Sequence, residues 1–199
     1  MHEDNFAPAN PSIVRGTAVS SIDGVVILAS QQPAELAWML AMLSSFVTQR
    51  TQSFCSVATA ATMLNALGVP APVDPVYAPH AYYTQANILG ECALGLTSHT
   101  GAPLSAGFIA THGATLDEWA AYLSCCAQPM AARHASEWSV DVFRTEVAAA
   151  LSDSPPRAVG LNFHRSGLGQ PGGGHMSPVA AYSAATDSML LLDVSRYKE

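Results

Sequence analysis

The pattern of apolar residues changes along the chain, and this change constrains the fold more than any other feature. Up to about residue 151 the apolar residues recur at helical spacing, whereas beyond residue 157 they gather in short runs between turn signals. The runs predict strands at 158–163, 176–182 and 189–194, with a turn at Thr186 and Asp187. Helices first and antiparallel strands second is the α+β pattern. We therefore expect an α+β fold, with a helical N-terminal part and a sheet in the C-terminal part.

Four segments before the strands carry the signals of helices. They cover residues 34–46, 56–67, 115–126 and 139–151. The third begins with a capping box, because Thr115 is followed three residues later by Glu118. Two shorter stretches, 20–30 and 129–134, predict additional strands. The section 69–105 is rich in turn residues and predicts loops with at most short helices.

Composition and charge narrow the class of protein. The chain has 199 residues and is 49% hydrophobic, enough for one domain with a full core, so we expect a loose arm at 1–17 and a single domain at 18–199. The net charge of −7 argues against a nucleic-acid partner. The longest apolar stretch, 34–47, is shorter than the roughly 20 residues of a membrane span, so no membrane partner is expected. No secretory signal is visible, which favours a cytoplasmic location, with the periplasm as the alternative.

Cys55 lies where an irregular polar stretch becomes the helix predicted at 56–67. There a thiol meets unpaired backbone N–H groups and the positive end of the helix dipole, both of which favour the nucleophilic thiolate. A cysteine nucleophile also needs a base, a group that orients the base, and donors for the developing oxyanion. The alternative for Cys55 is a buried structural thiol, the commonest fate of a free cysteine.

His175 and Asp193 are the candidates for the base and for the group that orients it. His175 follows the glycines at 172–174, which leave an imidazole accessible and let a substrate backbone approach closely. Asp193 follows the apolar run 189–192 and needs a partner, because an unpaired buried carboxylate is costly. The order Cys, His, Asp is that of papain-like acyl-transfer enzymes. The alternatives are a structural histidine and an aspartate paired with Arg196.

Two further polar residues could complete a site. Gln49 lies six residues before Cys55, the spacing at which papain-like enzymes carry the amide that donates to the oxyanion. Arg165 lies ten residues before His175, in a chain with only 8 Lys and Arg residues. Its guanidinium could hold a substrate carboxylate in a bidentate fork. The alternative for Arg165 is an ordinary surface arginine.

The four cysteines do not show the spacing of a metal site. They are Cys55, Cys92, Cys125 and Cys126, and no CxxC pair is present. The adjacent pair, Cys125 and Cys126, could bind a soft metal, but its place in a predicted helix favours core residues. No metal site is therefore predicted.

Three stretches of the sequence resemble phytochelatin synthase, and more closely its short bacterial, single-domain form. They are residues 49–67 (QRTQSFCSVATAATMLNAL), 162–182 (NFHRSGLGQPGGGHMSPVAAY) and 191–198 (LLDVSRYK). The similarity extends over about residues 20–198. It implies a papain-like cysteine peptidase fold, with Cys55 as the nucleophile, His175 as the general acid and base, Asp193 as the orienting group and Gln49 as the oxyanion donor.

The resemblance also implies substrate-binding residues and a reaction. Arg165 and Arg196 fall on family positions near the substrate sites, and Gly174 and Ser177, which flank His175, are assigned to substrate binding with them. In the family a thiolate attacks the Cys–Gly amide of glutathione, glycine leaves, and the γ-glutamylcysteinyl group passes to a second glutathione or to water. The products are phytochelatin or γ-glutamylcysteine. No cofactor is implied: Cd²⁺ or Zn²⁺ would enter as part of a metal–glutathione thiolate substrate, and a homodimer is left open.

The chain departs from the family at three points. It ends soon after the LLDVSRYK stretch, where the family continues, so a C-terminal truncation is expected. The family's glycine after the nucleophile is Ser56 here, and the cysteine-rich C-terminal domain of the plant enzymes is not expected. Two other functions stay open. One is a general cysteine peptidase or amidase acting on other small peptides or on glutathione S-conjugates, and the other is a non-enzymatic protein that binds metal through its cysteines.

Overall fold

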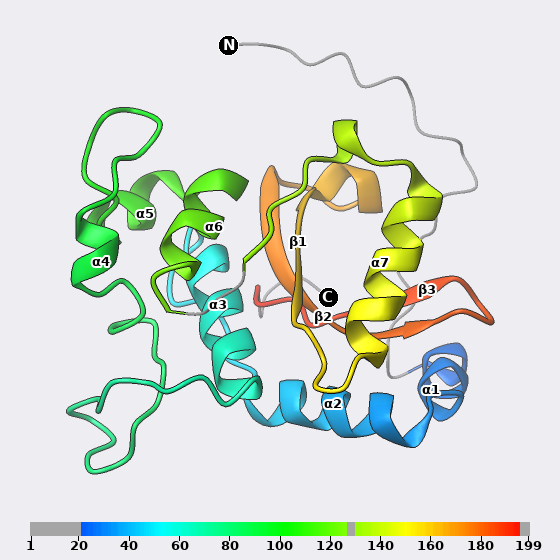
Figure 1. Cartoon of the computed structure of the whole chain (residues 1–199). Helices are drawn as coiled ribbons and strands as arrows, with labels where there is room; N and C mark the ends of the chain where they lie inside the picture. Colours follow the sequence, from blue (N-terminus) through cyan, green and yellow to red (C-terminus); the bar gives the residue numbers. More distant parts are fainter. Residues whose placement is uncertain (1–20, 127–129, 196–199) are drawn as a thin grey trace.

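The computed structural model describes residues 21–126 and 130–195. Within these ranges helices come first and a three-stranded antiparallel sheet follows, which confirms the α+β class (Figure 1). The arm predicted at 1–17 lies outside the described residues. No helix in the described ranges is both long enough and apolar enough to traverse a lipid bilayer.

All four predicted helices form, with ends close to those expected. They are α2 (Pro33–Ser44), α3 (Cys55–Ala66), α6 (Leu116–Leu123) and α7 (Val140–Ser152). The capping box of α6 is present, since Thr115 and Glu118 each bond the other's main-chain N–H. The section between α3 and α6 is rich in loops, as predicted, and holds the short helices α4 (Glu91–Leu94) and α5 (Ala106–His112).

Two of the predicted strands are wrong. The described part of 20–30, which begins at residue 21, forms helix α1 (Ile22–Ala29), and the hydroxyl of Ser21 accepts the N–H of Gly24 at 3.1 Å. A short apolar run without alternation fits a helix as well as a strand, and here the cap favours the helix. Residues 130–134 contain no strand and lead into a 3₁₀ turn at Ala135–Glu137, while residue 129 lies outside the described part.

The sheet has the order β1-β2-β3, and both neighbouring pairs are antiparallel. Its strands are β1 (Val159–His164), β2 (Gly174–Ser183) and β3 (Ser188–Leu191). All three were predicted, but β3 ends before the expected residue 194, so Asp193 lies just beyond the strand. Between β1 and β2 the chain forms a 3₁₀ turn at Arg165–Leu168.

Helix α3 and strand β2 form the centre of the core. Strand β2 is buried along nearly its whole length, and because successive residues point to opposite faces, both of its faces are covered. Helices α2, α3 and α7 pack against it (Figure 1). The hydroxyl of Thr59 in α3 donates to the main-chain oxygen of Met176 in β2 at 3.1 Å. This bond holds the first turns of α3 beside the start of β2, so Cys55 and His175 are brought together.

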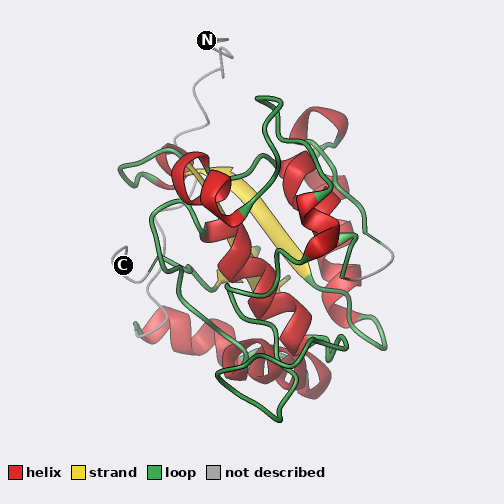
Figure 2. Ribbon diagram, turned by 90° about the vertical axis from the view of Figure 1, so that its left-hand side faces the viewer, coloured by secondary structure: helices red, strands yellow, loops and turns green. Residues whose placement is uncertain are grey.

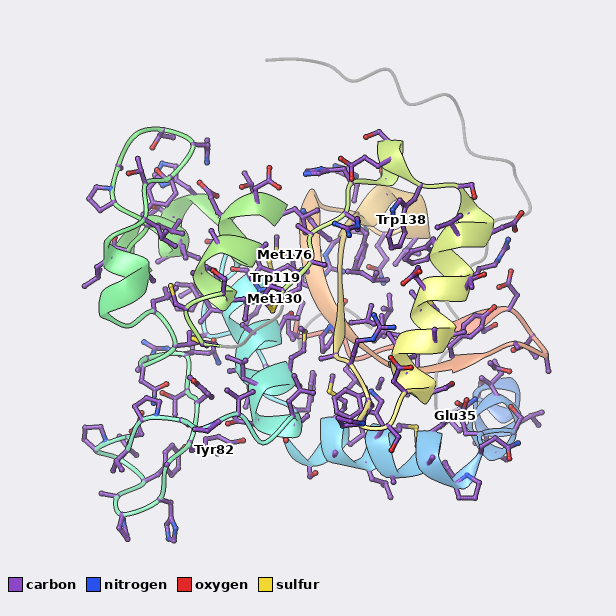
Figure 3. The ribbon with its side chains drawn as sticks, in the orientation of Figure 1. Glu35, Tyr82, Trp119, Met130, Trp138 and Met176 are labelled. Atoms are coloured by element: carbon purple, nitrogen blue, oxygen red, sulfur yellow. The ribbon has the colours of Figure 1, made fainter. Side chains whose placement is uncertain are left out.

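Helix α6 packs on the sheet through Trp119, which points from the helix toward β1 (Figure 3). Gly160 in β1 leaves room for the indole. A Cβ at this position would lie 2.2 Å from Cη2 of Trp119 and 3.1 Å from Sδ of Met63 in α3. Because both side chains are buried, any larger residue would have to displace the core. The absence of a side chain at Gly160 therefore lets α3, α6 and β1 meet.

The loops between α3 and α5 are tied to the rest of the chain by amide side chains. Asn65 of α3 donates from Nδ2 to the oxygen of Tyr83 (2.8 Å) and accepts the N–H of Tyr83 (2.9 Å). Gln85 likewise donates to the oxygen of Thr48 (2.9 Å) and accepts the N–H of Arg50 (2.9 Å). Figure 2, which views the molecule from this side, shows the loops in front of the helices and the sheet. Through Gln85, these loops hold in place residues 48–50, which lead into α3.

Candidate active site

Cys55 is the first residue of α3, the position expected for a nucleophile. It lies at the edge of the core with 9% of its surface exposed, and its thiol is free. No acidic side chain lies in the first turn of α3, so nothing there offsets the positive end of the helix dipole. The residue before it, Phe54, is buried and fixes the entry of the chain into the helix.

His175 is the second residue of β2 and is buried, with 3% of its surface exposed. It pairs across the sheet with Phe163, whose ring meets the imidazole edge to face at 5.6 Å between centroids. Its Nε2 lies 2.7 Å from Oδ1 of Asp193, which leaves Nδ1 for the thiol. Burial lowers the pKa of His175, but hydrogen bonds with Asp193 and Cys55 outweigh burial and raise the pKa above its ordinary value. The site therefore favours the imidazolium.

Asp193 accepts four hydrogen bonds. Its Oδ1 accepts from Nε2 of His175 (2.7 Å), from the N–H of Ser195 (2.8 Å) and from Nη2 of Arg165 (3.2 Å), and its Oδ2 accepts from Nη1 of Arg165 (3.0 Å). Burial raises the pKa of Asp193, but these bonds outweigh it and lower the pKa to about 2. The carboxylate is ionised at neutral pH, as a group that stabilises an imidazolium must be. Arg196, the alternative partner predicted for Asp193, lies outside the described residues.

Cys55 and His175 line one pocket of about 340 Å³, a size that suits a small peptide. Gly174, predicted to contact substrate, lines it as well. The other lining residues are Gln52, Ser53, His112, Gly113, Ala114, Asn162 and Met176. Among the described residues, neither arginine nor lysine contributes to the wall.

Arg165 lies behind Asp193 and not at the wall of the pocket. It is 4% exposed, so the alternative of a surface arginine is wrong. Its guanidinium also donates to Oε1 of Gln170 (2.6 Å) and to Oγ of Ser195 (2.9 Å). Binding of a substrate carboxylate by Arg165 stays a prediction, whereas the contacts in the structure are those of a residue that holds Asp193.

Neither Gln49 nor Ser177 lines the pocket. Gln49 donates its N–H to the oxygen of Val194 (2.8 Å) and its Nε2 to the oxygen of Thr51 (2.8 Å). The first of these bonds joins the predicted oxyanion donor to the stretch that carries Asp193, and the second is local. Ser177 is completely buried within β2 and does not line the pocket. The prediction that Ser177 contacts substrate is therefore corrected, because the strand carries this residue into the core.

His112 is a pocket residue that the sequence did not single out. It ends α5, its ring stacks on Phe108 with 4.5 Å between centroids, and its Nδ1 lies 2.7 Å from Oγ1 of Thr111. Asn162 reaches the same pocket from β1. His112 is one of seven histidines and lies in a loop-rich section. No local signal marks it, because the packing of α5 alone brings it to the site.

Among the cysteine side chains that the structure describes, no common metal site forms. Cys125 is disulfide-bonded, whereas Cys126 is a free thiol whose Sγ lies 4.0 Å from the oxygen of Tyr122. The side chain of Cys92 lies outside the described part of the chain. Within that part, no group of three or more His, Cys, Asp or Glu side chains could hold a metal ion. A site that uses all four cysteines as free ligands is therefore inconsistent with the structure.

Comparison with known proteins assigns the family. The family model described as phytochelatin synthase matches residues 14–199. The chain belongs to the phytochelatin synthase family. This confirms the resemblance seen in the three motifs, and it makes the chain a homologue of the glutathione gamma-glutamylcysteinyltransferases.

Three relatives show how much of the family's length is present. Glutathione gamma-glutamylcysteinyltransferase 3 of Lotus japonicus is 32% identical over 157 residues, which cover 79% of this chain and 30% of the relative. Glutathione gamma-glutamylcysteinyltransferase of Schizosaccharomyces pombe is 28% identical over 179 residues, which cover 90% of this chain and 40% of the relative. Glutathione gamma-glutamylcysteinyltransferase 1 of Arabidopsis thaliana is 26% identical over 180 residues, which cover 90% of this chain and 34% of the relative. The chain thus spans 30 to 40% of the length of these phytochelatin synthase relatives.

Proposed function

We propose that this protein catalyses acyl transfer or hydrolysis at the Cys–Gly amide of glutathione, through a γ-glutamylcysteinyl thioester on Cys55. The observation that carries the proposal is that Cys55 and His175 line one pocket and that Asp193 holds the His175 ring by a hydrogen bond. The names of the relatives support glutathione as the substrate. A helix that carries the nucleophile, beside a sheet that carries the base, also supports a papain-like fold.

In the first step the Cys55 thiolate attacks the carbonyl carbon of the Cys–Gly amide. His175 gives its proton to the leaving nitrogen, the C–N bond breaks, and glycine leaves as a free amino acid. The raised pKa of His175 keeps this proton available to higher pH than in an ordinary histidine, and Asp193 holds the ring by its Nε2. The N–H of Cys55 and the side-chain amide of Gln49 would stabilise the oxyanion.

In the second step an acceptor attacks the thioester and His175 takes the proton of the acceptor. Water gives γ-glutamylcysteine, and the amine of a second glutathione gives phytochelatin. Either acceptor restores the Cys55 thiolate and the imidazolium. Cd²⁺ or Zn²⁺ would take part as a component of the glutathione thiolate that enters the pocket.

The proposal is tested by incubating the protein with glutathione, with and without Cd²⁺, and identifying the products by mass spectrometry. Glycine together with γ-glutamylcysteine would show hydrolysis, and longer (γ-Glu-Cys)ₙ-Gly products would show transfer. If folded protein forms neither product under both conditions, the proposed function is wrong.

A second candidate is a general cysteine peptidase or amidase that acts on other small peptides or on glutathione S-conjugates. The absence of arginine and lysine from the described wall of the pocket favours it, because such residues usually recognise the carboxylates of a specific substrate. The values of kcat/KM for glutathione, S-methylglutathione and the dipeptide Cys-Gly separate the two candidates. Equal values for glutathione and the dipeptide would favour the general peptidase.

The pH profile of glycine release should have its alkaline limb above the ordinary pKa of histidine. The pKa of His175 is raised, so the imidazolium that protonates the leaving glycine persists to higher pH. Asp193 has a pKa of about 2 and stays ionised across the working range. In the Asp193→Asn variant the carboxylate that raises the pKa of His175 is gone. The alkaline limb should therefore move to lower pH, and kcat should fall by up to roughly 10⁴-fold.

The measurement is kcat/KM for glycine release between about pH 5 and pH 10. A matched control is Asp187→Asn, because Asp187 lies at the β2–β3 turn and pairs with the exposed Arg144. The control should keep the wild-type limb. An alkaline limb that stays in place in Asp193→Asn would contradict the assignment of Asp193.

A further inference from the structure

We propose that Ser195 is a positioning residue that fixes which end of the Gln49 amide faces the reacting carbonyl group. The inference deepens the proposed function and rests on it, since Gln49 matters only if an oxyanion forms at Cys55. Ser195 is 2% exposed and lies in the stretch after β3. It contacts Arg165 and Asp193 on one side and Gln49, the proposed oxyanion donor, on the other.

The hydrogen bonds of Ser195 can be given directions. A guanidinium has only donors, so Nη2 of Arg165 must donate to Oγ of Ser195 at 2.9 Å. The single hydroxyl hydrogen of Ser195 then remains for Oε1 of Gln49, 3.1 Å away. The main-chain N–H of Ser195 is used separately, since it donates to Oδ1 of Asp193 at 2.8 Å.

These directions decide the orientation of the Gln49 amide. The two ends of a glutamine amide have nearly the same shape, so packing alone distinguishes them poorly. Ser195 presents a donor to one end, and the oxygen of Thr51 accepts from Nε2 at the other end at 2.8 Å. A flipped amide would leave the Ser195 hydroxyl hydrogen without its acceptor on Gln49 and would place the amide oxygen against the Thr51 oxygen. Nε2 has a second N–H, which is left to donate to an oxyanion.

The same bonds join two functions of the site through Arg165. The guanidinium holds Asp193 with both terminal nitrogens, and one of these nitrogens also polarises the Ser195 hydroxyl toward Gln49. Asp193 orients the base, and Gln49 is the proposed oxyanion donor. Because the buried Arg165 fixes the Ser195 hydroxyl, and this hydroxyl bonds Gln49, Ser195 couples the orientation of Gln49 to the position of Arg165.

The first test is a double-mutant cycle on glycine release, with Ser195→Ala, Gln49→Ala and the double variant. Loss of an oxyanion donor costs about 10²- to 10³-fold in kcat, and loss of its positioning should cost about tenfold, with KM nearly unchanged. In the Gln49→Ala background, Ser195→Ala should slow the reaction by less than about twofold. Ser195→Thr, which keeps a hydroxyl, should recover most of the loss. Ser183→Ala, a buried serine at the far end of β2, is the matched control and should be unchanged.

Two readouts separate this role from a general effect on the fold or on His175. The alkaline limb of the pH profile should not move in Ser195→Ala, because the N–H that Asp193 accepts is retained. A tenfold loss that is equal in the wild-type and Gln49→Ala backgrounds would overturn the inference, whereas inactive wild-type protein would overturn the proposed function.

A second measurement tests the positioning without using activity. In ¹⁵N NMR of the side-chain amides, the Gln49 NH₂ should be ordered in the wild type and in Ser183→Ala, and more mobile in Ser195→Ala. An equally ordered Gln49 amide in Ser195→Ala would overturn the inference even if the protein proved to act on another substrate.

Discussion

Cys55→Ala should abolish the release of glycine from glutathione while the protein stays folded. Nucleophile, base and orienting group act as a unit, so loss of the attacking sulfur should lower kcat by roughly 10³- to 10⁶-fold. The fold should tolerate the change, because Cys55 lies at the edge of the core in a helix that accepts alanine well. We expect a loss of about 1 kcal/mol or less in the free energy of unfolding. Amino-acid analysis of released glycine, together with chemical denaturation, measures both effects.

Cys126→Ala provides the matched control for this substitution. Cys126 is also a free cysteine, but its Sγ lies against the main-chain oxygens of Ile88 (3.9 Å) and Tyr122 (4.0 Å) and not at the pocket. The control should release glycine at the wild-type rate. Activity in Cys55→Ala comparable to that of the control would contradict the assignment of the nucleophile.

Arg165→Met should destabilise the protein and nearly abolish activity. The substitution keeps much of the volume of the side chain but leaves Asp193 with two of its four hydrogen bonds, and it removes the donors to Gln170 and Ser195. Removal of one partner of a buried ion pair costs about 3–5 kcal/mol. Chemical denaturation measures this loss, and glycine release under conditions where the variant is folded measures the effect on the site.

Two comparisons show whether the effect comes from the buried ion pair. Arg157→Met removes an exposed ion pair with Asp153 and should cost about 1 kcal/mol or less. Arg165→Lys keeps the charge but cannot form the bidentate contact with Asp193. The free energy of unfolding of this variant should therefore lie between those of the wild type and Arg165→Met. If Arg165→Met were as stable as Arg157→Met, the proposed anchoring of Asp193 would be contradicted.

The parts of the fold that the sequence predicts well are those with local signals. The capping box at Thr115 marks the start of α6, and the apolar stripe after Cys55 marks α3. Because Cys55 is the first residue of α3 and His175 is the second residue of β2, correct prediction of these two elements already places the nucleophile and the base near element ends. The segment 20–30 shows the limit, since its apolar run does not distinguish a helix from a strand and a side-chain cap on Ser21 favours the helix.

The parts of the site that the sequence predicts poorly depend on contacts between distant segments. Arg165 could be identified as unusual in a chain with few cations, but its burial against Asp193 follows from the pairing of β1 with β2 and the path of the chain after β3. The bond from Ser195 to Gln49 joins residues 146 positions apart. His112 reaches the pocket only through the packing of α5. No local sequence pattern indicates these long-range contacts, so they can be identified only in the folded structure.

The most direct test of the account is to look for the acyl-enzyme itself. The protein is mixed with glutathione, quenched in acid within the first turnovers, and weighed intact by mass spectrometry, followed by peptide mapping. The account predicts a γ-glutamylcysteinyl group on Cys55, formed together with one equivalent of glycine and absent from Cys55→Ala. Glycine release without any adduct on Cys55, or an adduct on a different residue, would contradict it.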